Sequence, residues 1–422
     1  MYLIKISKGG KMETLTKMNL SVKFNSSVNF DDYKVLGKEA VEEIKARKGK
    51  SGQFLNWIGV LQENQIKNID TLYALYEKAK KGGFSDLAIL GIGGSRHTTE
   101  SMVKMLGVDD NIHFYSSVDP VSFERFAKRL NLDKTLFLVV SKSGGTLETT
   151  TAYNAAKALM QKHLNKEDVS DRFVAMTDAS SEKSALRRLV DKGDLMGSGY
   201  VHDDVGGRFS IFDDATLFTL FWANYTKEDV IGLLNSSLEA QQIYLNEDIN
   251  KNPALQMAAF NVDSRLNGNT KHFVEYFGDA FMGTTLWEKQ LKNESLKARI
   301  STDTNVGPGY LHYNAEADLD VNNKDSFFTF VYAKTEDKTT NAVLVGVINA
   351  YSNMHPVSIV EINGFDLKTL AQLIELKHFE TLYTGNILRR KENDVTSMDV
   401  AMPEVLQPNV EIYKKEVKKA LN

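Results

Sequence analysis

The most constraining feature of this sequence is a regular alternation, between residues 86 and 178, of short apolar runs with longer amphipathic stretches. The apolar runs are DLAIL, IHFYSSVD, TLFLVV and RFVAMTD, and each precedes a segment long enough for a helix. Strands that alternate with helices pair in parallel through right-handed crossovers, and such sheets are buried on both faces. The pattern therefore predicts an α/β domain with a mainly parallel sheet flanked by helices.

A second group of strand-like runs follows a long helical region that begins at Asp214. These runs are KHFVEYF, SFFTFVYA and VSIVEI, whereas TNAVLVGVINAY fits a helix or a strand and is interpreted as a helix. In the last segment, QPNVEIYKKEVKKALN, Pro408 suits the first turn of a helix. We therefore expect a helical lead-in at 1–75, a first α/β domain at 76–215, a second at 216–402 and a C-terminal helix at 403–422.

Composition argues against several classes of function. The 422 residues carry a formal net charge of −4 without a long basic block, which argues against general binding to nucleic acid or to anionic membrane. Because cysteine is absent, disulfides, thiolate nucleophiles and cysteine-ligated zinc are excluded. The eight histidines show no metal-binding spacing, and we identify neither a signal peptide nor a membrane span. We expect a cytoplasmic protein of enzyme size.

Small polar residues gather in the loops that follow two of the predicted strands. GIGGS, at 91–95, and SKSGGTLETTT, at 141–151, each lie beyond the carboxyl end of a strand, where ligands bind in α/β sheets. Glycines let backbone N–H groups face an anion, and hydroxyls can bind a phosphate monoester. The alternatives are a tight turn without a ligand for the first loop and a helix N-cap for the second. The two loops together favour a phosphate site.

Two nucleotide-binding patterns fit this region less well. Lys142 precedes the glycines and no Gly-Lys-Ser/Thr follows, so the second loop is not a P-loop. GIGGSRH lacks the third glycine of the dinucleotide fingerprint, and Ser116 and Ser117 stand where an acidic residue is expected. A dinucleotide-binding fold remains the weaker alternative.

Four further positions receive no role from spacing alone. They are Arg208 in GGRFSIF, Glu294 in WEKQLKNES, His312 in GYLHYNAE and the lysines of the last segment. Each fits an ordinary structural or solvent-exposed position when it is taken by itself. Beside an anionic intermediate, however, a fixed arginine would act as an electrostatic stabiliser.

Taken in order, these segments resemble the glucose-6-phosphate isomerase (phosphoglucose isomerase) family, in particular its shorter bacterial form. The matching segments are LGIGGS, SSVDP, SKSGGTLET, GGRFS, WEKQLKNES, STD with LHY, and QPNVEIYKK, and they span residues 50–422. The sequence departs from the family at Gly145, where threonine is usual. The resemblance implies two phosphosugar-isomerase (SIS-type) domains, each a mainly parallel sheet flanked by helices, in a homodimer with a shared active site.

The resemblance also implies a reaction, which is the reversible conversion of glucose 6-phosphate to fructose 6-phosphate through a cis-enediolate, in glycolysis and gluconeogenesis. No metal or other cofactor is expected to take part. The residues implied for the substrate phosphate are Gly94, Ser95, Ser141, Lys142, Ser143, Thr146 and Thr149, and Glu148 completes the motif. Ring opening is assigned to His312 and Lys414, with Lys415 as the alternative lysine. Proton transfer is assigned to Glu294, and stabilisation of the enediolate is assigned to Arg208.

Two alternatives remain open at this point. An isomerase of the same class could also accept mannose 6-phosphate or another ketose or aldose phosphate, because specificity depends on pocket shape around the second to fourth carbons. A phosphosugar-binding regulator without turnover would keep the two loops and lose the base. The presence of Glu294 and Arg208, together with His312 and Lys414, argues against the regulator.

Overall fold

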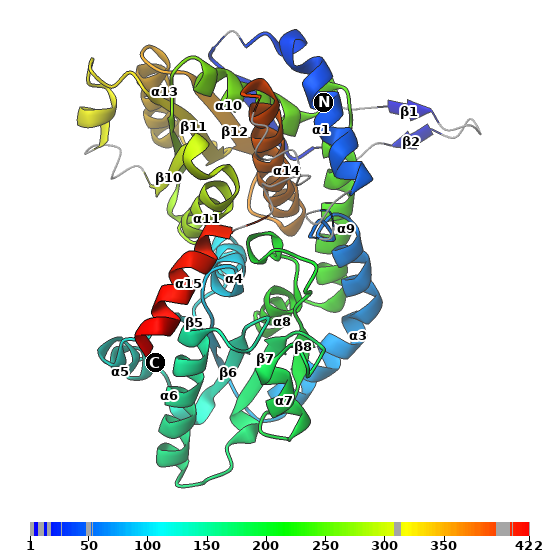
Figure 1. Cartoon of the computed structure of the whole chain (residues 1–422), viewed down its shortest axis with the longest axis vertical. Coiled ribbons are helices and arrows are strands. Elements are labelled where there is room, and N and C mark those ends of the chain that lie inside the picture. The colour runs from blue at the N-terminus through cyan, green and yellow to red at the C-terminus, as the bar shows by residue number, and fades with distance from the viewer. Residues whose placement is uncertain are drawn as a thin grey trace. The chain divides into compact units, whose positions relative to one another are not determined.

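The computed structural model describes residues 4–6, 12–14, 18–26, 28–47, 52, 54–307, 314–393, 406 and 408–421. By contact, the chain divides into two compact units, and each contains one five-stranded sheet (Figure 1). Unit 1 comprises Met1–Leu55, Ser236–Asp279 and Glu288–Asn422, and unit 2 comprises Asn56–Asn235 and Ala280–Trp287. These units are defined by contacts between residues, and each combines separate stretches of the chain. They therefore do not test the boundaries of the four segments expected from the sequence.

The sheet of unit 2 is parallel throughout, with the order β5-β4-β6-β7-β8. Its strands are β4 (Asp86–Leu90), β5 (Ile112–Tyr115), β6 (Thr135–Val140), β7 (Phe173–Thr177) and β8 (Ser198–Tyr200). The four apolar runs predicted as strands are therefore confirmed. The short edge strand β8 was not expected from the sequence.

Helices follow each of the first four strands of unit 2, as the alternation predicts. The helices of this unit are α3 (Val60–Lys80), α4 (Gly94–Met105), α5 (Pro120–Ala127), α6 (Leu147–Leu164), α7 (Ala185–Asp191) and α8 (Asp214–Trp222). The first part of helix α11 (Thr284–Leu296, TTLWEKQLKNESL) also belongs to unit 2. Asp119 begins α5 as its N-cap, since its carboxylate accepts hydrogen bonds from the Val121 and Ser122 N–H groups.

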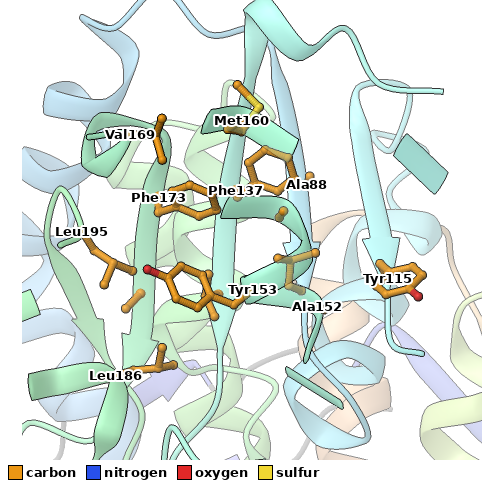
Figure 2. Close-up of a cluster of buried hydrophobic side chains, with 14 of the residues drawn as sticks. Ala88, Tyr115, Phe137, Ala152, Tyr153, Met160, Val169, Phe173, Leu186 and Leu195 are labelled. Atoms are coloured by element: carbon orange, nitrogen blue, oxygen red, sulfur yellow. The ribbon is translucent and has the colours of Figure 1, made fainter. Parts of the chain in front are cut away.

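One hydrophobic cluster fixes α6 and α7 against the sheet of unit 2 (Figure 2). The Phe137 and Phe173 rings of neighbouring strands stack with centroids 5.2 Å apart. The Tyr153 ring of α6 meets Phe173 edge-on at 5.3 Å. Leu186, in the first turn of α7, belongs to the same buried cluster. The packing therefore fixes α6 and α7, and the first residues of both helices lie beside the loop that follows β6.

The sheet of unit 1 has the order β10-β9-β11-β12-β3 and is parallel except for β3, which pairs antiparallel with β12. Its strands are β3 (Leu20–Phe24), β9 (Lys271–Phe277), β10 (Ser301–Val306), β11 (Ser326–Ala333) and β12 (Val357–Ile362). The three runs predicted as strands in this part of the chain are confirmed. A separate antiparallel pair is formed by β1 (Ile4–Ile6) and β2 (Met12–Thr14).

Helices cover both faces of this second sheet. Phe328 of β11 packs on Tyr351 of α13, with ring centroids 4.8 Å apart, while its neighbour Phe327 faces Phe260 of α10 at 6.0 Å. The helices not yet given are α1 (Lys34–Ala46), α9 (Lys227–Tyr244), α10 (Pro253–Leu266), α13 (Lys338–Ser352), α14 (Leu367–Lys391) and α15 (Pro408–Leu421). The helix predicted for TNAVLVGVINAY is confirmed, as is the α/β class, and α15 forms a helix in the last segment from Pro408, as its sequence suggests. Within the described residues, no helix is long and apolar enough to cross a membrane.

Candidate functional site

The loop between β6 and α6, residues 141–146 (the SKSGGT loop), is shaped by its own hydroxyl groups. The Ser141 Oγ lies 3.0 Å from the Thr146 Oγ1 and accepts a hydrogen bond of 3.1 Å from the Gly144 N–H. Gly144 has φ +64°, and a Cβ at this residue would lie 2.3 Å from the Leu186 nitrogen. Only glycine fits there, so the loop packs closely against the start of α7.

Thr177 and Ser184, whose hydroxyl groups were not singled out from the sequence, support the SKSGGT loop. The Thr177 Oγ1, at the end of β7, lies 2.8 Å from the Ser141 carbonyl oxygen and 3.1 Å from that of Lys142. The same hydroxyl lies 2.5 Å from the Ser184 Oγ. Ser184 is the N-cap of α7, where its side chain accepts from the Arg187 N–H. A serine directly before a helical stretch is the available signal, and such a residue is typical of an N-cap.

The amino termini of α4 and α6 lie at the same edge of the unit 2 sheet, because β4 and β6 are parallel neighbours. In the described structure, neither N-cap residue, Gly93 for α4 or Thr146 for α6, caps its helix with a side-chain hydrogen bond. Ser143 is exposed in the loop, and its Oγ accepts from the Gly145 N–H at 3.2 Å. The positive end of a helix suits an anion. At α4, however, the Ser95 and Arg96 N–H groups donate to the Ile92 and Gly93 carbonyl oxygens, so the anion-binding donors would come mainly from the start of α6.

The loop of residues 91–95 (the GIGGS loop) touches both the end of β6 and the GGR segment. A Cβ on Gly91 would lie 3.2 Å from the Val140 carbonyl oxygen. A Cβ on Gly94 would lie only 2.2 Å from the Gly207 carbonyl oxygen. The two loops and the GGR segment therefore come together within unit 2, and Ser95 lies half-buried beside them.

Arg208, which follows Gly207 directly, is held in this region by its neighbours. Its side chain is 2% exposed, and its guanidinium carbon lies 5.1 Å from the centre of the Phe209 ring. The Phe209 ring stacks on Trp57 at 5.2 Å, and the Arg208 carbonyl oxygen accepts from the Trp287 Nε1 at 2.9 Å. A buried arginine anchored in this way has a fixed position.

The lysine of the SKSGGT loop is held by backbone oxygens and has several carboxyl groups near it. The Lys142 Nζ donates to the backbone carbonyl oxygens of Asp203 and Val205, each at 3.2 Å. Burial lowers the pKa of Lys142, and the nearby carboxylates of Asp213 and Asp203 oppose that shift. Burial also raises the pKa of Asp213 well above its ordinary value, and it raises the pKa of Asp214 to about 6. Burial near the loop therefore disfavours the charged forms of Lys142, Asp213 and Asp214.

Two other residues implied for the phosphate motif lie in the first turn of α6. Glu148 is half-buried there. Thr149 is 3% exposed, and its hydroxyl has no hydrogen-bond partner in the described part of the chain. Their roles stay predictions.

The remaining candidate residues belong to unit 1. Glu294 is half-buried in the last turn of α11, and its Oε1 accepts from the Gln290 Nε2 at 3.0 Å, one helical turn away. Gln290 was not singled out as a site residue, although it stands in the matched motif. Lys414 and Lys415 are exposed on α15. His312 lies outside the described residues, and its role stays a prediction.

Comparison with known proteins identifies related sequences. A family model described as phosphoglucose isomerase matches residues 66–336. The glucose-6-phosphate isomerase of Methanocaldococcus jannaschii is 26% identical over 323 residues, which cover 73% of this chain and 75% of that protein. That of Lactobacillus delbrueckii subsp. bulgaricus is 24% identical over 461 residues and is matched over 97% of its length. Four further relatives are matched over 56–63% of their own length.

A solved structure shares the fold. The crystal structure of a glucose-6-phosphate isomerase from Chlamydia trachomatis has a TM-score of 0.78 and 16% sequence identity, covering 96% of this chain and 89% of that one. At this level of identity, the likeness concerns the fold alone. Together with the two sheets, it confirms the expected α/β fold, in which each sheet is mainly parallel and flanked by helices.

Proposed function

Because this chain belongs to the phosphoglucose isomerase family, we propose that it converts glucose 6-phosphate reversibly into fructose 6-phosphate, in glycolysis and gluconeogenesis. The proposal rests mainly on one observation, which is that the GIGGS loop, the SKSGGT loop and the GGR segment lie close together. They do so at the N-termini of two helices that no side chain caps. Such an arrangement suits a phosphate monoester. The family match then connects this anion site with an isomerase.

The proposed phosphate site consists of the SKSGGT loop together with Gly94 and Ser95. Ser143 is exposed and Thr146 is half-buried, so both hydroxyls are available to a ligand. The uncapped first turn of α6 adds N–H donors, and Lys142 adds a cation whose backbone contacts fix its position. Thr149 and Glu148 are proposed to order this site from the first turn of α6.

Glu294 is the proposed general base. Its carboxylate would take the proton from C2 of the open-chain aldose, while a C1–C2 double bond forms and the electron pair moves onto O1. The resulting cis-enediolate would then receive the proton at C1 as the O2 hydroxyl proton passes to O1 and O2 becomes the ketone. The hydrogen bond from Gln290 supports the role, because it helps to orient the carboxylate.

Three further residues complete the proposed mechanism. The fixed guanidinium of Arg208 would stabilise the negative charge of the enediolate. His312 and Lys414 would transfer the protons that open and close the sugar ring.

The enzyme is proposed to act in the cytoplasm as a homodimer with a shared active site.

The test is an assay of the purified full-length protein with fructose 6-phosphate, with and without a metal chelator. We expect glucose 6-phosphate to form at the same rate in both conditions. Binding of the sugar phosphate without turnover would contradict the proposal and favour a phosphosugar-binding regulator.

Sedimentation velocity on the same sample is expected to give the mass of a dimer.

A further inference from the structure

A cavity of about 540 Å³ opens at the carboxyl end of the edge strand β5, and all its lining residues belong to unit 2. The residues that line it include three arginines and three serines, which are Arg96, Arg125, Arg129, Ser116, Ser117 and Ser122. No acidic residue lines this arginine cavity among the described residues. None of its lining residues is among those assigned above to the sugar phosphate, although Arg96 directly follows Ser95 and β5 is the parallel neighbour of β4.

Arg96 forms a fixed wall of the arginine cavity. Its Nε donates to the Glu100 Oε2 at 2.8 Å, and its Nη1 donates to the Ser116 Oγ at 2.6 Å. Its guanidinium carbon lies 6.0 Å from the centre of the Phe114 ring. The carboxylate of Glu100 balances the charge of Arg96, so the net positive charge of the cavity comes from the other two arginines.

Arg125 and Arg129 present cations that the protein does not neutralise. They lie four residues apart, in α5 and the turn that continues it. Within residues 54–307, neither guanidinium forms a hydrogen bond or an ion pair, although that of Arg129 lies 6.0 Å from the Phe126 ring centre. Like charges at this spacing repel each other, and a bound anion would relieve that repulsion.

The serines and the size of the cavity define the class of ligand. Guanidinium groups bind phosphate through pairs of parallel hydrogen bonds, and serine hydroxyls can donate to the remaining phosphate oxygens. A volume of about 540 Å³ lies within the range of small-molecule sites. We propose that the arginine cavity binds a small phosphorylated molecule, independently of the sugar-phosphate site.

Equilibrium dialysis of the full-length protein with radiolabelled inorganic phosphate, at constant ionic strength, tests this proposal. We expect Arg125→Gln/Arg129→Gln to bind one phosphate fewer per chain than the wild type, or to bind that phosphate at least tenfold more weakly. The matched control is Lys128→Gln/Lys134→Gln, which removes the same charge from exposed lysines that do not line the cavity. An unchanged stoichiometry in the arginine variant, or an equal loss in the lysine control, would overturn the proposal.

A second pair of measurements checks the chemistry of recognition. Arg125→Lys/Arg129→Lys keeps the charge and removes the planar fork, so it should weaken phosphate binding several-fold and leave the thermal unfolding temperature unchanged. Malonate serves as a dianion without phosphate geometry. If malonate displaces the labelled phosphate from this site as well as unlabelled phosphate does, the assignment to a phosphorylated ligand is wrong.

Discussion

At the residue scale, Ser143 and Thr146 are the side chains through which the SKSGGT loop would hold a substrate phosphate. Hydrogen bonds to a charged group contribute about 1.5–3 kcal/mol each, so Ser143→Ala/Thr146→Ala should raise KM for sugar phosphates by roughly 100-fold or more. Steady-state kinetics measures the change. Thr150→Ala is the control, because the Thr150 hydroxyl donates back to the Thr146 carbonyl oxygen at 3.0 Å. An unchanged KM in the double variant would remove the phosphate assignment.

Asp214 gives a prediction about pH and stability. Burial raises the pKa of this carboxyl from its ordinary value of 3.8 to about 6, so the folded protein binds a proton more tightly than the unfolded chain does. Stability should therefore fall as pH rises from about 4 to about 6, by on the order of 2 kcal/mol from this group. Asp214→Asn should flatten that part of the profile of unfolding temperature against pH. The exposed Asp110→Asn is the control, and equal slopes in wild type and Asp214→Asn would contradict the prediction.

Sequence reasoning reached the residues that offer chemistry and missed those that position them. Ser141 and Thr146 stand in a conspicuous motif directly after an apolar run. Thr177 and Ser184 touch the same loop from a different strand and helix, and only the folding of β7 beside β6 brings them there. Contacts of this kind depend on strand order, which a local pattern does not contain.

At the scale of elements, the close approach of Gly94 to Gly207 sets how α4 meets the GGR segment. A Cβ on Gly94 would lie 2.2 Å from a backbone oxygen, which cannot rotate away as a flexible side chain can. Gly94→Ala should therefore destabilise unit 2 by about 1–3 kcal/mol and weaken sugar-phosphate binding. Thermal unfolding and a binding titration measure the two effects.

The control for that variant has the opposite expected sign. Gly232 lies within α9, and a Cβ there would meet nothing within 4 Å. Because glycine is costly inside a helix, Gly232→Ala should stabilise the protein by roughly 0.5–1 kcal/mol. If Gly94→Ala were tolerated as well as Gly232→Ala, the contact between α4 and the GGR segment would not constrain the site.

Elements with strong apolar runs were predictable, whereas of the four edge strands, β5, β8, β10 and β3, only β5 was predicted. The central strands β4, β6 and β7 are buried along their whole length or nearly so, and they stand out as DLAIL, TLFLVV and FVAMT. In contrast, β8 is the three-residue SGY and β10 is the polar STDTNV. An edge strand pairs on one side only and buries less of its surface, so its sequence carries a weaker signal.

At the scale of the whole molecule, unit 1 has a fully buried group of charges that joins α11 to α14. The Lys292 Nζ lies 2.6 Å from the Glu380 Oε1, and the Lys377 Nζ lies 3.0 Å from the Glu288 Oε1, with all four side chains buried. Burial alone would raise the pKa of Glu380, but the ammonium groups of Lys292 and Lys377 hold it below its ordinary value. The buried carboxylate of Glu380 therefore depends on its two lysine partners.

Removing one partner should be costly. Lys292→Met would leave a buried carboxylate short of a cation, which costs about 3–5 kcal/mol, and should lower the unfolding temperature by several degrees. Lys289→Met is the matched control on the same helix, because Lys289 forms an exposed pair with Asp303 at 2.8 Å and should cost under about 1 kcal/mol. Calorimetry of both variants checks the difference, and equal losses would mean that burial of the group is not what matters.

The organisation into units could not be deduced from the order of the segments. Strand β3 pairs with β12, so that Phe24 lies opposite Ser358, although more than three hundred residues separate them in the chain. The class of fold follows from local alternation, whereas such a pairing follows from the closure of the whole chain. The sequence interpretation therefore reached both sheets and missed the antiparallel edge of the second.

The most direct test of the proposed mechanism is exchange of the C2 proton of glucose 6-phosphate with solvent deuterium, followed by NMR for the wild type and Glu294→Gln. A general base contributes roughly 100- to 10,000-fold to rate, so the amide should reduce exchange at C2 by at least 100-fold while sugar-phosphate affinity stays within a few-fold. We expect rapid exchange in the wild type and this loss in the variant. Exchange that persists in Glu294→Gln at the wild-type rate would show that another group moves the proton.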